Sequence, residues 1–276
     1  MDNMSNNNMH ALDTLIPKTQ EDGTVGKALI MLNIVATATK PMRFNEILAH
    51  SPFPKATTYR FLQSMTNQGM LAYNVESQKY TLGMRLVRLA HQAWQQASLA
   101  PIAGPFLDQL ASQVNETIHL AQIENGQVLF IDKRRTSERF ETLAQAGRVA
   151  PAHCTGVGKA MLAYLSPERL AFAMRHQTFI QFTPATLDCA AALQKDLESI
   201  RQEGIAFDRE EHESGIISIA APILTSKQQV IGAISIATST SRHTLKDLQQ
   251  YRQPLLHIAN NIGLEAECWH FPTHNQ

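Results

Sequence analysis

The sequence predicts an α+β protein with two domains: a small helical domain, a connecting helix, and a larger domain built on a mainly antiparallel sheet. The length of 276 residues favours two domains over one. Apolar residues at helical spacing, interrupted by proline and glycine, dominate segment 25–98. Beyond it, short strand-like runs alternate with amphipathic helical segments. Hydrophobic residues at 44% and charged residues at 17% are typical of a globular protein with a sizeable core.

The first domain is expected to begin with three helices. Segment 25–39, VGKALIMLNIVATAT, carries apolar residues at helical spacing and ends before Pro41. Segment 43–51, RFNEILAHS, predicts a second, shorter helix. A proline-rich turn follows, and Pro54 stands near the first position of the third helix, where its fixed φ is tolerated. This third helix is expected to end near Gly69.

A hairpin and a further helix follow in the sequence. Segment 70–83, MLAYNVESQKYTLG, predicts two short strands joined by a polar turn. Three helices and a hairpin predict a winged helix-turn-helix unit over residues 24–83. Segment 84–99, which precedes Pro101, is expected to be a linker helix. The polar, asparagine-rich residues 1–23 are expected to form a disordered tail.

The second domain, residues 100–270, is expected to combine an antiparallel sheet with flanking helices. Asn125-Gly126 lies between two strand-like runs and is a strong hairpin signal. Further strands are expected at 139–147, 204–208, 217–224 and 230–238. Helices are expected from Thr155 to Leu165, over 192–204 with a cap at Gly204, and over 244–267 with a kink at Pro254.

The third helix of the first domain has two different faces. Its apolar stripe is expected to be buried and consists of Thr58, Phe61, Leu62 and Met65. The opposite face carries groups that suit a DNA major groove, where Arg pairs with guanine, Gln with adenine, and Thr or Ala contacts the thymine methyl. Hydroxyls and Lys can instead contact phosphates. The candidate DNA-binding residues on this helix are Lys55, Ala56, Thr57, Tyr59, Arg60, Gln63 and Ser64.

The alternative interpretation of this polar face is a helix surface that only meets solvent. Charge favours DNA, because residues 25–98 hold eight basic and two acidic side chains, a net charge of +6. The whole chain is neutral, with 24 basic and 24 acidic residues. The spacing of the helices and the position of Lys79 in the predicted wing also favour DNA binding.

Motifs in both domains make the chain resemble the IclR family of bacterial transcriptional regulators. The matching segments, in order, are GKALIMLNIVA, KATTYRFLQSMTNQGML, YTLGMRLVRLA, ETIHLAQIENGQVLFID, HCTGVGKAMLAYLS, GIAFDREEHESGIISIAAPI and GAISIA. They extend from Thr24 to Glu267. The resemblance implies an N-terminal winged helix-turn-helix, a linker helix, and a C-terminal GAF-like effector-binding domain.

The resemblance also implies how such a protein works. Family members are dimers or tetramers that bind palindromic operators in double-stranded DNA, and a small metabolite, often an organic acid, changes their DNA affinity. We therefore expect a ligand-responsive regulator, a repressor rather than an activator, with no catalytic residues, no metal and no cofactor. The effector is expected to be a carboxylate. Apolar residues of the linker helix, such as Leu86, Leu89 and Trp94, are expected in a dimer interface.

The resemblance places the effector site between the sheet and segment HCTGVGKA. Matching positions are Gly156, Val157, Asp208, Ile216, Ser218 and Ser235, and Thr155 belongs to the same loop. Many relatives have cysteine at the position of Ser218, and some have serine at the position of Ala237, so the ligand is not transferable from a single relative. Exposed amides where a helix begins after Thr155 suit a carboxylate. The alternative is that the glycines of this loop only permit close packing.

Two enzymatic alternatives remain open for the C-terminal domain. Cys154 lies near a helix start, where a thiol pKa can be lowered, but adjacent His153 points the other way in an extended segment. A metal site formed by His119, His153, His212 and Asp208 is the second alternative, although no metal-binding spacing supports it. The acidic segment 208–213 is instead expected to be a solvated loop.

Cysteine usage and the length of the apolar runs indicate the compartment and the relation to membranes. The chain has three widely spaced cysteines and no CxxC pair, which indicates a reducing, cytoplasmic environment. The N-terminal residues lack the charged and apolar regions of a signal peptide. The longest apolar runs are far shorter than the ~20 residues that a membrane-spanning helix needs, so no membrane association is expected.

Overall fold

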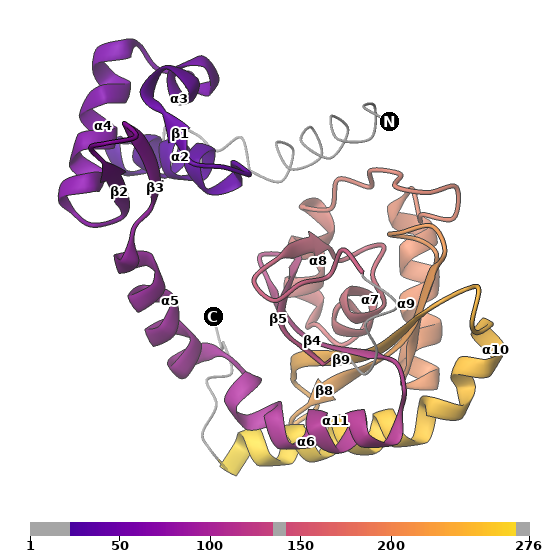
Figure 1. Ribbon diagram of the computed structural model, residues 1–276. Helices are drawn as coiled ribbons and strands as arrows, with labels where there is room; N and C mark the ends of the chain where they lie inside the picture. The colour runs from indigo at the N-terminus through magenta and orange to yellow at the C-terminus, as the bar shows by residue number, and fades with distance from the viewer. Residues whose placement is uncertain (1–22, 135–141, 269–276) are drawn as a thin grey trace. The chain divides into compact units, whose positions relative to one another are not determined.

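The structure, a computed structural model, describes residues 23–134 and 142–268. The predicted disordered tail therefore lies almost entirely outside the described residues. The chain divides into two compact units, one up to Ala93 and one from Trp94, which we call the N-terminal and C-terminal units (Figure 1). The helix predicted as the linker, α5 (Met84–Ala97), contains this division.

The N-terminal unit holds three helices and a small sheet, as the helical spacing and the hairpin signal predicted (Figure 1). The helices are α2 (Thr24–Thr37), α3 (Phe44–His50) and α4 (Lys55–Asn67). The sheet has the strand order β1-β3-β2, with β1 (Met42–Arg43), β2 (Leu71–Asn74) and β3 (Lys79–Leu82). Strand β1 was not predicted, because a two-residue strand leaves no alternating pattern.

The core of the N-terminal unit is formed by one face of each helix. Met31, Ile47 and Leu62 are fully buried and come from α2, α3 and α4. On α4 the predicted stripe is confirmed, with Met65 buried and Phe61 packed against the core. Burying a side chain of this size contributes about 1.5–3 kcal/mol. This packing fixes which face of α4 meets solvent.

The C-terminal unit is built on a six-stranded antiparallel sheet with the strand order β6-β5-β4-β9-β8-β7. The strands are β4 (Thr117–Glu124), β5 (Gln127–Arg134), β6 (Val149–Pro151), β7 (Ala206–Arg209), β8 (Ile216–Leu224) and β9 (Val230–Ser239). The helices are α6 (Ala100–Gln113), α7 (Gly156–Leu162), α8 (Pro167–Arg175), α9 (Ala190–Glu203), α10 (Leu245–Leu248) and α11 (Arg252–Cys268), with a 3-10 turn at Gln249–Tyr251.

The two faces of this sheet carry different side chains. On β8 and β9, Ile219 and Ile236 alternate with Ser218 and Ser235, and strand side chains point to opposite faces in turn. The large aliphatic residues form one core with α6 and α11, which lie side by side (Figure 1). The small and polar residues lie on the face against which α7 packs. The small side chains thus leave room for a site on the α7 face of the sheet.

Several boundaries differ from those predicted. The described part of the strand expected at 139–147 is a loop ending in a turn at Gly147, whose φ is +84°, and the strand is Val149–Pro151 instead. The terminal helix is interrupted by the 3-10 turn before Pro254, so proline lies in the first turn of α11, where it is tolerated. Helices α6 and α8 were not predicted, because Pro101, Pro105 and Pro167 interrupted the sequence pattern.

Other predictions in the C-terminal unit hold. Gly204 ends α9 in the left-handed conformation with φ of +77°, as a C-terminal cap does. The turn at Asn125-Gly126 joins β4 to β5, and both residues have positive φ. Among the described residues, no helix combines the length and apolar character needed to cross a membrane.

Candidate functional site

The exposed face of α4 is the candidate nucleic-acid surface. Of the predicted residues, those on the solvent side of the helix are exposed, namely Lys55, Ala56, Tyr59, Arg60, Gln63 and Ser64. Thr57 is half-buried, and so is Lys79, which lies on β3 opposite Arg43 of β1. The helix therefore presents one continuous polar face, and its basic groups are free to reach a ligand.

Hydrogen bonds hold the turn between α3 and α4. The Thr58 side chain is fully buried, and its hydroxyl lies 2.8 Å from the Ser51 hydroxyl and donates to the Phe53 carbonyl at 3.2 Å. The Phe53 amide donates to the Ser51 hydroxyl at 3.1 Å. This local network satisfies the buried hydroxyl and fixes α4 relative to α3. A fixed angle between these helices is what a helix-turn-helix needs to present its second helix.

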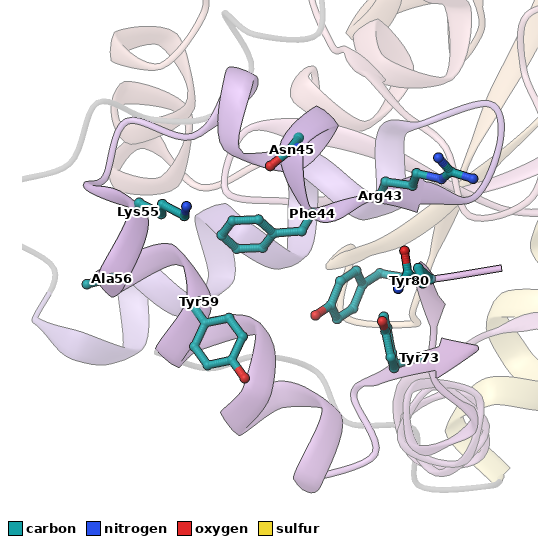
Figure 2. Close-up of a pocket in the computed structure, with 9 residues that line it drawn as sticks. Arg43, Phe44, Asn45, Lys55, Ala56, Tyr59, Tyr73 and Tyr80 are labelled. Carbon is teal, nitrogen blue, oxygen red and sulfur yellow. The ribbon is translucent and has the colours of Figure 1, made fainter. Parts of the chain in front are cut away.

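A hollow with a volume of about 780 Å³ lies between α4, the start of α3 and the hairpin β2–β3 (Figure 2). We call it the aromatic hollow, because four of its nine lining residues are aromatic. The lining residues are Arg43, Phe44, Asn45, Lys55, Ala56, Tyr59, Tyr73, Gln78 and Tyr80. Three of them are predicted DNA-binding residues, Lys55, Ala56 and Tyr59. The other six were missed, because they come from segments that only the fold brings together.

A second cavity lies in the C-terminal unit, between the sheet and α7. It has a volume of about 40 Å³. All seven residues predicted for the effector site line it, namely Thr155, Gly156, Val157, Asp208, Ile216, Ser218 and Ser235. Seven further residues also line it: His119, Phe130, Thr142, Ala144, His212, Glu213 and Ala237. His119 was not predicted for this site; the alternation along β4, which places His119 on the face opposite Ile118 and Leu120, is the signal that could have identified it.

Strand pairing places the cavity residues beside one another. Ser218 of β8 lies opposite both Asp208 of β7 and Ala237 of β9. Ser235 of β9 lies opposite His119 of β4, and their side chains are 3.5 Å apart, between the Ser235 Oγ and the His119 Nδ1. The cavity wall is therefore a continuous patch of small and polar side chains across four strands.

The two imidazoles of the cavity are neutral. Burial, followed by the nearby charge of Lys133, lowers the pKa of His119 to about 3. Burial is also the first cause that lowers the pKa of His212 to about 4, followed by His153 and Arg148. The Nε2 of His119 lies 3.1 Å from the Thr142 hydroxyl. A neutral imidazole offers one donor and one acceptor, so this wall suits a ligand with hydroxyl or carboxyl groups.

The carboxyl group of Asp208, which lines the cavity, has a raised pKa. Burial is the largest cause that raises its pKa, to about 7, and the nearby charge of Glu211 adds to the increase. The Glu211 amide, which donates to the Asp208 carboxyl at 2.8 Å, opposes it. Behind this loop, the fully buried Lys159 pairs with Glu211 at 2.5 Å and Asp196 at 2.8 Å. This ion cluster ties α7 to α9 and to the loop after β7.

The acidic segment 208–213 is therefore not the solvated loop that was predicted. Asp208 and Glu211 are 7% and 2% exposed, because the loop folds over α7 and pairs with Lys159. Hydroxyls hold its backbone, since Thr183 donates to the Glu210 carbonyl and Thr186 to the Glu211 carbonyl, both at 2.6 Å. Charge composition alone suggested solvent exposure and missed the buried lysine.

The glycines of α7 serve close packing. A Cβ on Gly158 would lie 2.4 Å from the Ala152 carbonyl oxygen, and a Cβ on Gly156 would lie 2.7 Å from the Ser218 hydroxyl. Helix α7 therefore approaches its neighbours more closely than any larger residue allows. This close approach supports the interpretation that the glycines permit packing. Helix α7 is also short, with seven residues. The hydroxyls and imidazoles, rather than the helix start, are the stronger candidates for ligand contacts.

Neither enzymatic alternative matches this geometry. Burial raises the pKa of the Cys154 thiol well above its usual range, so the thiol stays protonated instead of acting as a nucleophile. His153 contacts Gln177 and Phe179 instead of the cavity wall. Within residues 23–134 and 142–268, no three His, Cys, Asp or Glu side chains form a group that could hold a metal ion.

The fold and the two surfaces define a class: a DNA-binding transcriptional regulator with a helix-turn-helix and a separate ligand-binding domain. Comparison with known families agrees with this class. Residues 24–74 match the IclR helix-turn-helix domain, and residues 91–264 match the domain described as bacterial transcriptional regulator IclR C-terminal. The chain belongs to the IclR family of bacterial transcriptional regulators.

Individual relatives are regulators and not enzymes. The chain is 29% identical to the HTH-type transcriptional regulator XynR of Escherichia coli over 88% of this chain and 98% of the relative. It is 32% identical to the regulator KdgR of Dickeya chrysanthemi over 79% of this chain and 72% of the relative. An IclR homologue from Microbacterium hydrocarbonoxydans, solved with 4-hydroxybenzoate, matches the fold with a TM-score of 0.75 at 22% identity, over 89% of this chain and 100% of that chain.

Proposed function

We propose that the protein represses transcription from a palindromic operator, and that a small organic acid in the C-terminal cavity changes its affinity for that operator. In this proposal the exposed face of α4 reads the operator, with Arg60 and Gln63 at base edges and Lys55 on a phosphate. The single observation that carries the effector half is the cavity, which gathers all seven residues predicted for the effector site.

The chemistry of the cavity supports an acid with a further polar group. Ser218 and Ser235 supply hydroxyl donors for a carboxylate, and neutral His119 supplies a donor or an acceptor. Phe130 adds an aromatic wall and packs against His119, with the two rings tilted by 58° and their centres 5.5 Å apart. Such a wall suits an aromatic or other compact apolar body. The 4-hydroxybenzoate of the Microbacterium protein is an acid of this kind.

The size of the cavity supports a coupling between occupancy and conformation. About 40 Å³ is far below the ~300–1,000 Å³ of typical ligand sites. An effector therefore has to separate the lining elements when it binds. A ligand that binds one conformation better than another shifts the population toward it, which is the requirement for a regulatory response.

The expected homodimer or tetramer also belongs to this proposal. Helix α5 leaves Met84, Val87, Leu89 and Trp94 exposed, which is unusual for a single helix of a monomer. Pairing two copies along such a surface would give the two-fold symmetry that a palindromic operator requires. Leu86, in contrast, packs against the core of the N-terminal unit.

A thermal-shift screen of aliphatic, aromatic and sugar acids tests the effector half. We expect at least one acid to raise the melting temperature of the wild-type protein, and Ser235→Ala to reduce that increase. Ser199→Ala is the matched control, because Ser199 is exposed on α9, away from the cavity. An acid that stabilises the wild type and Ser235→Ala equally would contradict the proposed site.

A further inference from the structure

We propose that the aromatic hollow binds one sugar-phosphate strand of the DNA duplex, through Arg43, Tyr59 and Tyr73. The proposal rests on the proposed docking of α4 in the major groove. It adds a second, sequence-independent contact surface, made largely of residues outside α4.

The position of the hollow follows from its walls. One wall is the first turn of α4 with the start of α3, and the other is the hairpin β2–β3 (Figure 2). In duplex DNA, the major groove is separated from the neighbouring minor groove by one phosphodiester strand. If α4 lies in the major groove, the strand at its edge must occupy the space between the helix and the hairpin. That space is the hollow.

Two aromatic pairs form the sides of the hollow. On the helical side, the rings of Phe44 and Tyr59 meet edge to face, with centres 6.0 Å apart. On the sheet side, Tyr73 and Tyr80 face each other across β2 and β3, with ring centres 4.7 Å apart. Each pair holds its rings in place and exposes apolar ring surface against which a deoxyribose can pack. The paired arrangement keeps the hollow open.

The side chains that line the hollow also carry hydrogen-bond donors that suit a phosphodiester. The tyrosine side chains Tyr59 and Tyr73 are 51% and 39% exposed, so their hydroxyls are available as donors. Burial, with the neighbouring hydroxyls of Tyr73 and Tyr59, raises the pKa of Tyr80, so its hydroxyl also keeps its proton. In Figure 2 Lys55 lies on one side of Phe44 and Arg43 lies on the other, with the Arg43 side chain extending outward from the rings. Hydroxyl, guanidinium and ammonium donors are those that contact DNA phosphates.

The charge of the hollow disfavours a cationic partner and suits an anion. Its lining contains two basic side chains and no acid. Glu46, the acid nearest in sequence, has its carboxylate engaged by the Arg43 amide at 2.6 Å. This bond lowers the pKa of Glu46 and keeps the carboxylate at the start of α3. A polyanion with apolar sugar faces is therefore the matching ligand.

Binding titrations with two duplexes test the proposal: a random-sequence duplex, and an operator selected from a random pool by the wild-type protein. Fluorescence anisotropy is recorded at several salt concentrations with full-length protein. We expect Tyr59→Phe and Tyr73→Phe each to weaken both duplexes equally, by about threefold to tenfold, because each loses one hydrogen bond. We expect Arg43→Ala to weaken both and to reduce the salt slope by about 0.9, and Arg43→Lys to restore the slope.

Matched controls separate a site from a general effect. Lys27→Ala removes an exposed charge from α2, and Tyr164→Phe removes a hydroxyl from the C-terminal unit; both are expected to bind as the wild type does. Hollow variants that bind both duplexes with wild-type affinity would overturn the proposal, and so would losses confined to the operator. Wild-type protein that binds random DNA but selects no operator would refute the proposed function alone, while the hollow variants still decide the hollow.

Discussion

At the scale of single residues, burial sets the protonation states of the groups that line the cavity. The cavity holds two neutral imidazoles and a carboxyl group, Asp208, whose pKa is raised to about 7. These shifts have the same physical cause, since a charged group loses hydration when it is buried. The two imidazoles therefore add polarity to the cavity without adding positive charge at neutral pH. Such a wall recognises a ligand by hydrogen bonds and by shape.

Asp208→Asn is expected to stabilise the C-terminal unit in a pH-dependent way. The Asp208 carboxyl binds its proton more tightly in the folded chain, with a pKa of about 7 against 3.8 for an ordinary aspartate. Its contribution to stability is thus fully present below about pH 4 and is lost as the pH rises through 7. The stability gained by Asp208→Asn should increase from pH 4 to 7 and stay constant above, reaching a few kcal/mol.

Thermal unfolding of both proteins between pH 4 and 9 measures this difference. His119 and His212, whose pKa values are lowered, titrate in both proteins, so their effect cancels in the comparison. A stability difference that does not change with pH would show that Asp208 is ionised at its ordinary pKa.

At the scale of elements, α4 and α7 are held in place in different ways. Helix α4 buries Leu62 and Met65 and is fixed by the Thr58 hydroxyl, so its polar face points away from the core. Helix α7 is buried along its whole length and depends on glycine where it meets Ala152. The first helix is free to meet a partner, while the second supports the cavity.

Substitutions on the exposed face of α4 separate base contacts from phosphate contacts. If Arg60 reads a base, Arg60→Ala should weaken operator binding by about 1–3 kcal/mol and leave binding to random DNA nearly unchanged. Lys55→Ala should weaken both duplexes alike and reduce the salt slope. Equal losses for Arg60→Ala on operator and random DNA would place Arg60 on a phosphate instead.

Two glycine substitutions test the packing of α7. Gly158→Ala is expected to destabilise the C-terminal unit by about 1–3 kcal/mol, because its methyl group would overlap the Ala152 backbone. Gly104→Ala, in α6, is the control, since the nearest atom is an Arg134 side-chain nitrogen at 3.8 Å. Replacing an unhindered helical glycine by alanine stabilises by up to ~1 kcal/mol. Chemical denaturation that gives both variants the same stability would contradict the close approach of α7.

At the scale of the whole molecule, most of the architecture was predictable from local patterns. The three N-terminal helices, the hairpin, α9 and strands β7, β8 and β9 each carry clear periodicity or a cap such as Gly204. The resemblance to the IclR family supplied six of the residues that line the cavity, and Thr155 was predicted from the same loop. Local signals failed where tertiary contacts decide, as at the loop after Thr142, the buried pair of Lys159 and Glu211, and the proline-bearing helices α6 and α8.

The two sites also differ in how far local sequence patterns reveal them. Residues of α4 were found because a single helix carries them on one face. The aromatic hollow was not found, since Arg43, Tyr73 and Tyr80 come from three short strands whose pairing no local pattern reveals. His119 was considered only as a metal ligand, whereas the sheet register places it beside Ser235. Long-range strand pairing is therefore the information that the sequence patterns lacked.

The central claim is that a ligand in the C-terminal cavity changes the affinity of the N-terminal unit for DNA. The most direct measurement is the operator Kd of the full-length protein, with and without the acid that most raises its melting temperature. The account predicts a change of at least about fivefold for the wild type, and a smaller change for Ser235→Ala. An acid that saturates and stabilises the protein while the operator Kd stays the same would contradict the account.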